Sequence, residues 1–326
     1  MRRAGALLLA GLAALILAAG ALGLAWRDWN RPAPPGAARV EVDVPRGASI
    51  ASAASALEAG GLVPSARRFR IAARLFGGDR PIRYGLYAFP KGAGGAELLR
   101  MMQAGDVMTL ALAIPEGLPS VLVHERLMAA PRLAGTVEVP PEGSVLPATW
   151  SYVPGETRAA VLARMQAGMK STLDELWAAR SPNTAVATKE EALILASIVE
   201  KETGKASERR TIAGLYSNRL RAGRKLEADP TVIYPVTQGR PLGRRIRRSE
   251  LAADTGWNTY ARTGLPKGPI TNPGRDSLAA VLDPETHDFL FMVADGTGGH
   301  AFARDYAEHQ ANVARWYDLR RAKGEM

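Results

Sequence analysis

Three patterns of hydrophobic and polar positions divide the chain. Residues Ala4 to Trp26 form an uncharged run rich in Leu and Ala. Residues 39–44 then alternate, with valines at every second position, which predicts a strand with one buried face. Between residues 189 and 202, apolar residues recur at helical spacing, and the segment ends in the carboxylate of Glu202. The patterns predict an apolar N-terminal segment followed by an α+β protein.

The first run is long enough to cross a membrane. At about 1.5 Å per residue, roughly 20 apolar residues span the hydrocarbon core of a bilayer. Arg2 and Arg3 precede the run, so residues 1–3 are expected in the cytoplasm and residues 4–26 in the membrane. Trp26 and Trp29 would lie at the outer membrane surface. A cleaved signal peptide is the alternative, but the run is long for one, which favours an uncleaved anchor.

Residues 27–38 are rich in proline and predict a short, semi-rigid linker. A small mixed lobe is expected over residues 39–108. Its elements would be the strand 39–44, a helix from the Ser49 cap to Ala59, a helix after Pro64 and Ser65, a strand over 82–89 and a short helix over 96–102.

A larger α+β lobe is expected over residues 109–326. It would hold a strand over 111–117, a helix over 120–128, a loop and strand over 142–152, and a helix over 158–169 capped by Thr157. Asp229-Pro230-Thr231 is expected to form a turn held by the Asp229 side chain.

The helix that starts near Lys189 carries the strongest chemical signal. Thr188 and Glu191 predict a capping box at its start. At 3.6 residues per turn, Glu202 continues the apolar face of Leu195, Ile198 and Val199, whereas Glu200 lies on a more polar face with Leu193 and Ser197. Burial would raise the pKa of Glu202, as a general acid near neutral pH requires. The alternative is a solvated residue in the last helical turn.

Composition excludes several other chemistries. The chain has a net charge of +10 and no cysteine, so neither disulfides nor thiolate metal sites can form. An arginine-rich segment, 240–248, accounts for much of the positive charge, and no nucleic-acid-binding motif accompanies it. We therefore expect no nucleic-acid partner. The segment is expected to be a loop that faces anionic lipid, acidic cell-wall groups or only solvent. The four histidines form no zinc motif, and no P-loop or Gly-x-Ser-x-Gly elbow is present, so neither a metal nor a cofactor is expected.

Several segments in order resemble the endolytic murein transglycosylase family, also called the YceG-like family. The most specific are Ile198-Val-Glu-Lys-Glu-Thr203 and Asp229-Pro-Thr-Val-Ile-Tyr234, and the resemblance covers roughly residues 39–316. It implies that Glu202 is catalytic and that the small lobe is a LysM-like module. Whether that lobe holds a glycan or only supports packing stays open, because a fold does not fix a function.

The resemblance implies a lytic reaction with one carboxylate. Glu202 would protonate the glycosidic oxygen of peptidoglycan and then act as base toward the C6 hydroxyl of N-acetylmuramic acid, closing a 1,6-anhydro ring. Expected substrate-binding residues are Thr203, Asn218, Arg219, Asp229, Tyr234, Asn258, Tyr260 and His300. Three positions depart from the family pattern: Ala148 replaces a usual acidic residue, Trp257 a usual Tyr and Lys267 a common Pro.

The expected product is 1,6-anhydro-ended glycan cut internally from new strands, in a bacterial inner membrane protein whose catalytic lobe is periplasmic. The resemblance implies peptidoglycan synthases, the penicillin-binding proteins, as partners. Two rivals stay open: a non-catalytic scaffold that binds peptidoglycan, and a muramidase that uses water.

Overall fold

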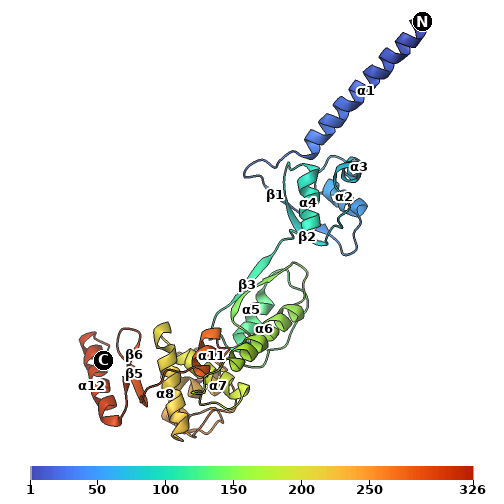
Figure 1. Ribbon diagram of the computed structural model, residues 1–326. Coiled ribbons are helices and arrows are strands. Elements are labelled where there is room, and N and C mark those ends of the chain that lie inside the picture. The colour runs from blue at the N-terminus through green and yellow to red at the C-terminus, as the bar shows by residue number, and fades with distance from the viewer. Residues whose placement is uncertain (1, 326) are drawn as a thin grey trace. The chain divides into compact units, whose positions relative to one another are not determined.

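The structure is a computed structural model that describes residues 2–325 (Figure 1). It separates into two compact units. One comprises Met1–Leu110 with Tyr152–Gly155, and the other comprises Ala111–Ser151 with Glu156–Met326. Helices and short two-stranded sheets occur in both units, so the predicted α+β class is confirmed. The likeness of the small lobe to a LysM module stays a prediction.

Helix α1 (Arg2–Trp29) opens the first unit. By length and composition its segment Gly11–Trp29 can cross a membrane, and its large apolar side chains from Leu9 to Trp26 are exposed. The level of Trp26 and Trp29 at a membrane surface stays a prediction, but the Trp29 side chain does not face outward. Its indole is only 5% exposed because it packs against Phe69 and Phe76 of the small lobe.

The small lobe forms around one antiparallel pair of strands. Strand β1 (Arg39–Val44) pairs with β2 (Gly85–Pro90), placing Val42 opposite Tyr87. The helices α2 (Ile50–Ala59), α3 (Ala66–Phe76) and α4 (Gly95–Ala104) complete the lobe. Ser49 and Ser65 cap α2 and α3, as their positions predict.

Residues 30–38 do not run free of this lobe. The Gly94 amide donates to the Arg31 carbonyl at 2.7 Å, and the Ala33 amide donates to a Glu97 carboxylate oxygen at 3.2 Å. The proline-rich segment is therefore fastened to α4 at two points, and α1 and the lobe are joined without a flexible spacer.

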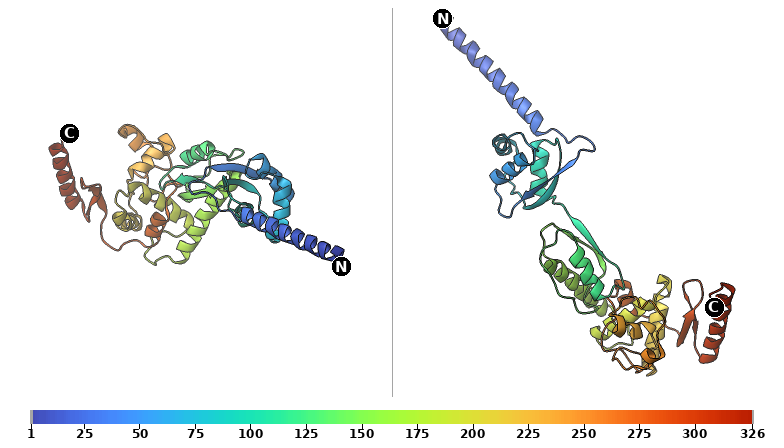
Figure 2. Two further views of the ribbon diagram at one scale, coloured as in Figure 1. Left: turned by 90° about the horizontal axis from the view of Figure 1, so that it is seen from above. Right: turned by 180° about the vertical axis from the view of Figure 1, so that it is seen from behind.

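The second unit is mostly helical. Its first strands are β3 (Leu110–Ile114) and β4 (Ala148–Tyr152), which pair with each other. The helices are α5 (Ser120–Ala129), α6 (Arg158–Ala178), α7 (Lys189–Glu202), the 3₁₀ turn η1 (Ala206–Glu208), α8 (Arg209–Arg221), α9 (Asp229–Thr237), α10 (Arg248–Ala252), α11 (Arg275–Leu282) and α12 (Tyr306–Ala322). Strands β5 (Phe291–Ala294) and β6 (His300–Ala303) form a hairpin beside α12 (Figure 2).

Helix α7 lies at the centre of this unit, and its two faces are both buried. Leu195 and Ile198 are fully buried as predicted, but Ser197 on the supposedly polar face is equally buried. The reason is that α6, α8, α9 and α11 all contact α7. The Ser197 hydroxyl accepts a hydrogen bond from the Ile270 amide and donates to the Ile194 carbonyl, so the polar group is satisfied inside the core.

Candidate active site

A cavity of about 230 Å³ opens at the C-terminal end of α7. The end of α7, one face of α8, the segment before α9, the loop after α10 and the β5–β6 hairpin all contribute side chains. The lining residues are Glu202, Leu215, Tyr216, Arg219, Leu226, Glu227, Asp229, Tyr260, Met292, Val293, Ala294 and His300. Charged and aromatic groups thus converge from segments nearly a hundred residues apart.

Glu202 is the last residue of α7 and faces this cavity. Thr203 ends the helix, and both its amide and its hydroxyl donate to the Val199 carbonyl, the hydroxyl at 2.7 Å. Within residues 2–325, no side chain or amide donates a hydrogen bond to the Glu202 carboxylate. A carboxylate at a helix C-terminus also meets the negative end of the helix dipole, which disfavours its charged form.

The pKa of Glu202 is raised to about 7. Burial is the largest cause because it removes water from the charged form, and the negative charge of Asp229 adds to it. The positive charge of Arg219 opposes both effects. The carboxyl is therefore poised to give up and take back a proton near neutral pH.

Glu200 meets the opposite surroundings only two positions earlier. One of its oxygens accepts hydrogen bonds from the Gly274 amide at 2.9 Å and the Ser277 hydroxyl at 2.7 Å. Gly274 is the N-cap of α11, so the Glu200 charge also lies at the positive end of that helix dipole. Glu200 therefore holds α7 to α11, and these hydrogen bonds engage its carboxylate in structural contacts.

Asp229 and Tyr260 form a fixed pair on the cavity wall. The Tyr260 hydroxyl donates to Asp229 Oδ1 at 2.7 Å. The Asp229-Pro230 segment is not the predicted turn: it begins α9, because proline suits the first turn of a helix, and Asp229 suits the N-terminal end of its dipole. Burial and the Asp229 charge raise the pKa of Tyr260, which keeps it a hydrogen-bond donor.

Two buried threonines bring that pair together. The hydroxyls of Thr231 and Thr259 lie 2.8 Å apart, and the Ala228 amide donates to the Thr259 hydroxyl at 3.0 Å. Both threonines are fully buried. The start of α9 and the loop that carries Tyr260 are therefore locked together beneath the cavity.

Arg219 forms the buried floor of the cavity and is 7% exposed. Its Nε donates to the Leu290 carbonyl at 2.7 Å, and its Nη1 donates to the Leu226 carbonyl at 2.6 Å and to Glu227 at 3.0 Å. Nη2 makes no hydrogen bond to the described part of the chain. The guanidinium is thus fixed on one side and has an unused donor on the other.

His300 stands at the start of β6. Its Nδ1 lies 2.9 Å from a Glu208 carboxylate oxygen, and its amide donates to the other oxygen at 3.1 Å. Glu208 therefore fixes the imidazole and leaves the second ring nitrogen free to meet a ligand in the cavity.

Four predicted binding residues are not among those that line the cavity: Thr203, Asn218, Asn258 and Tyr234. The Asn218 amide group donates to the carbonyls of His287 and Phe289, and the Asn258 amide group donates to three carbonyls near the end of α10. Both asparagines brace loops. Tyr234 lies against Glu142, whose charge together with burial raises the pKa of the phenol to about 12.

The departures from the family pattern also lie away from the cavity lining. Ala148 is exposed at the start of β4. The Trp257 ring packs against Tyr234 at 5.3 Å between centroids, and Lys267 Nζ lies 3.8 Å from the centre of the Trp257 ring. The Trp257 ring is thus covered on one side by a lysine.

The sequence did not single out Tyr216, Glu227 or Glu208. Tyr216 precedes Arg219 by three positions on α8, so a helical-face argument of the kind applied to Glu202 would have found it. Glu208 carried no such signal, because its partner His300 lies 92 residues further along the chain. Glu227 lies in the loop between α8 and α9, where no helical period marks it. Among residues 2–325, no group of three or more His, Asp and Glu side chains is arranged to hold a metal ion.

Comparisons with known proteins agree on one family. The sequence model described as the YceG-like family matches residues 42–315. The protein named endolytic murein transglycosylase of Streptococcus pneumoniae serotype 2 (strain D39 / NCTC 7466) is 26% identical over 325 residues, which cover 84% of this chain and 58% of that protein. The protein of the same name from Bacillus subtilis (strain 168) is 22% identical, with 87% and 86% covered. This chain therefore matches less than two thirds of the length of the pneumococcal relative.

A solved structure shares the fold. The crystal structure of a yceG-like protein of Listeria monocytogenes aligns with a TM-score of 0.50 and 23% identity, covering 85% of this chain and 99% of the other.

Proposed function

Because the chain belongs to the YceG-like family, we propose that it is an endolytic lytic transglycosylase acting on peptidoglycan. It cleaves the bond between N-acetylmuramic acid and N-acetylglucosamine inside a glycan strand. The observation that carries the proposal is the state of Glu202. Its carboxyl faces a polar cavity, accepts no hydrogen bond from the described residues and has a pKa near 7.

Glu202 serves both halves of the reaction. With a pKa near 7, roughly half of the carboxyl is protonated at neutral pH, so it gives its proton to the glycosidic oxygen as the bond to C1 breaks. The resulting carboxylate then takes the proton of the C6 hydroxyl, whose oxygen attacks C1 and closes the 1,6-anhydro ring. The enzyme ends in its starting state, and no water is consumed.

The remaining cavity groups position the sugar. Asp229 raises the pKa of the general acid and is itself held by Tyr260, so the pair tunes Glu202 and does not supply a second nucleophile. Arg219 presents its free donor to the lactyl or peptide carboxylate of the substrate by a charge-assisted bond. His300, fixed by Glu208, donates to a sugar hydroxyl or acetamido oxygen.

Thr203, Asn218, Asn258 and Tyr234 support the site indirectly. Their hydrogen-bonding groups meet backbone carbonyls or Glu142, so their part is to hold the elements that carry Glu202, Arg219 and Tyr260 in place.

The apolar helix anchors the protein in the bacterial cell membrane. Its N-terminus is cytoplasmic, since two arginines precede the run, and the remainder lies outside the cytoplasm. Nascent glycan emerges at that surface beside penicillin-binding proteins, which are the proposed partners. A water-using muramidase and a non-catalytic scaffold are the two alternatives.

Product analysis tests the proposal. Long purified glycan is digested with the wild-type protein, and the fragments are identified by mass spectrometry. Mid-sized fragments with anhydro ends are expected early. A reducing end, one water heavier, would identify a muramidase, whereas disaccharides released while long strands persist would identify an exolytic enzyme. If the wild-type protein and the Glu202→Gln variant bind glycan equally well and neither releases product, the protein is a scaffold.

A further inference from the structure

The most basic helix of the small lobe lies beside the end of the membrane helix. Helix α3 has 11 residues and carries four arginines and no acidic residue: Arg67, Arg68, Arg70 and Arg74. No carboxylate within residues 2–325 forms an ion pair with any of them. Four arginines that make no ion pair, on three turns of helix, produce a positive local potential.

The outer surface of the same helix is also apolar. Ile71 and Leu75 are 51% and 65% exposed, and they lie one helical turn apart, so they share a face. The buried side is held by Phe69 and Ala73. Helices with exposed aliphatic residues flanked by arginines are typical of segments that lie in the interface of a membrane.

Contacts with α1 set the level of α3 along the membrane helix. The Trp26 ring packs edge-on against Phe76 at 5.1 Å between centroids. A cavity of about 430 Å³ between the two helices is lined by Leu22 and Ala25 of α1 and by Ile71 and Leu75 of α3. Leu22 belongs to the segment that can cross a membrane, so Ile71 and Leu75 lie beside the end of that segment.

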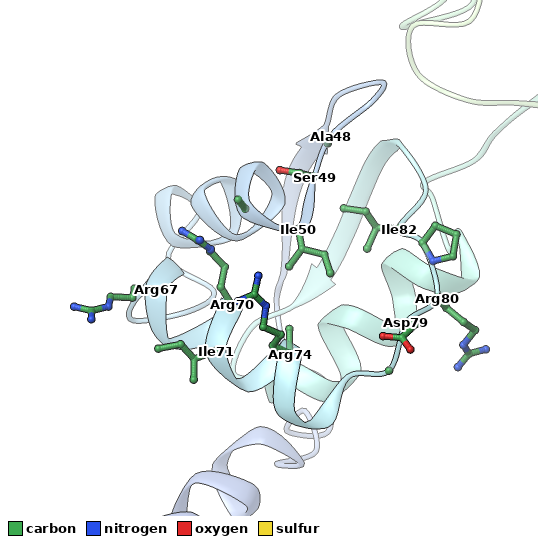
Figure 3. A pocket seen from close by; sticks show the side chains of 14 residues that line it. Ala48, Ser49, Ile50, Arg67, Arg70, Ile71, Arg74, Asp79, Arg80 and Ile82 are labelled. Carbon is green, nitrogen blue, oxygen red and sulfur yellow. The ribbon is translucent and has the colours of Figure 1, made fainter.

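A second, larger cavity follows the other side of α3. Its volume is about 860 Å³, and its charged lining consists of Arg67, Arg70, Arg74, Arg80 and Asp79. Figure 3 shows the Arg70 and Arg74 side chains next to each other near Ile50, while Arg67 and Arg80 point outward at opposite ends. The arginines thus border an apolar strip that begins at the membrane helix.

We propose that α3 is a docking surface for the anionic phospholipids of the membrane that α1 crosses. Ile71 and Leu75 enter the apolar boundary of the bilayer, and Arg67, Arg70 and Arg74 bind headgroup phosphates. The small lobe is then held against the bilayer by two contacts, the spanning helix and α3. This inference rests on the proposed membrane anchorage of α1 and is independent of the chemistry at Glu202.

The absence of cysteine allows a direct test. A nitroxide attached to Leu75→Cys in the full chain reports its surroundings, with Ser55→Cys on α2 as the matched exposed control. Both are made in a Glu202→Gln background, so activity does not enter the readout. The chain is reconstituted in nanodiscs of phosphatidylcholine alone or of an equal mixture with phosphatidylglycerol. Collision rates with lipid-dissolved oxygen and with an aqueous nickel chelate are measured.

The label at Leu75 should favour oxygen over the nickel chelate in the anionic nanodiscs, and the label at Ser55 should favour the chelate. Removing two arginines, Arg70→Gln with Arg74→Gln, should shift the equilibrium between membrane-bound and free α3 toward the free state by about tenfold or more. The reason is that each basic residue near an anionic surface adds a similar share of the electrostatic attraction. Removing the same charge elsewhere in the lobe, Arg46→Gln with Arg100→Gln, should shift it far less.

Three results would overturn the proposal. A Leu75 label that is equally open to the aqueous chelate in both nanodiscs would place α3 in solvent. The second is a label that is equally buried with and without phosphatidylglycerol and is unaffected by the Arg70→Gln and Arg74→Gln substitutions. That result would show that anionic lipid does not hold α3 at the membrane. A label that changes only when soluble glycan strands are added would make the surface a glycan site. Loss of catalysis in the wild-type protein would bear on the proposed function alone.

Discussion

Glu200 and Glu202 lie two positions apart at the end of α7, and their carboxylates meet opposite surroundings. Glu200 accepts hydrogen bonds from the Gly274 amide and the Ser277 hydroxyl, whereas Glu202 receives none from the described residues and faces the cavity. The same residue type therefore serves as a structural anchor in one case and as a candidate acid and base in the other. The helical period separates the two faces, and the partners on each face decide the role.

Substitution of each glutamate should have a distinct effect. Glu202→Gln removes the proton donor and base, so the rate of glycan cleavage should fall by about 10² to 10⁴, the usual contribution of general acid–base catalysis. Folding should be kept, which circular dichroism checks. Glu200→Gln should retain most activity but lower the free energy of unfolding by about 1 kcal/mol, since a neutral amide accepts less strongly at the α11 N-terminus. A greater loss of activity in Glu200→Gln than in Glu202→Gln would contradict this assignment.

The pH profile should respond to Asp229. Glu202 must be protonated to act as an acid, so activity should fall as pH rises through about 7. The Asp229 charge is one cause of the raised pKa of Glu202. Asp229→Asn should therefore lower that pKa and move the descending limb of the pH–activity curve to lower pH. The measurement is kcat/KM against pH for both proteins. A limb that stays in place, or moves to higher pH, would show that Asp229 does not act on Glu202.

Stability should depend on pH through Glu202. Its folded pKa of about 7 exceeds the unfolded value near 4.5, so the protonated form favours folding. That stabilisation is fully present below pH 4.5 and is lost as pH rises through 7. Glu202→Gln should therefore become more stable relative to wild type between about pH 5 and pH 8, by on the order of 1–3 kcal/mol. Urea unfolding of the two proteins at both pH values measures the difference, and an unchanged difference would argue against a raised pKa.

The hairpin that carries His300 should depend on Glu208. Glu208→Gln replaces one of the two acceptor oxygens with an amide nitrogen, so the His300 amide or ring loses a partner. We expect KM for glycan to rise several-fold, with a smaller change in kcat, because orientation of a binding group is affected and the acid is intact. The control is Glu250→Gln, at a glutamate that pairs with Arg244 and does not line the cavity. A fall in kcat at constant KM would assign Glu208 and His300 to the chemical step instead.

The apolar helix should remain in the mature protein. N-terminal sequencing of membrane-extracted protein is expected to show a mature chain that still contains residues 4–26. A mature chain that starts after about Ala25 would show that the run is a cleaved signal peptide.

Local patterns predicted much of the secondary structure. Ser49, Ser65, Thr157 and Thr188 all cap the start of a helix, as predicted. Such caps can be predicted because the side-chain oxygen accepts a hydrogen bond from a backbone amide only three residues later, so the whole signal is local in the sequence. The 3.6-residue period likewise separated Glu202 from Glu200. The start of α9 escaped prediction, because Asp229-Pro230 suits a turn and a helix start equally well.

Only the tertiary structure decided which polar residues meet Glu202. Asn218 and Asn258 carry amides that suit sugars, but both amide groups donate to nearby backbone carbonyls instead. Arg219, Asp229, Tyr260 and His300 converge because α8, the start of α9, the loop after α10 and the β5–β6 hairpin meet around one cavity, and no local signal encodes those long-range contacts. Trp29 shows the same limit: no local signal indicates that Phe69 and Phe76 bury its indole in the small lobe. Short-range hydrogen bonding and periodicity fixed the helices, and packing between distant segments fixed the site.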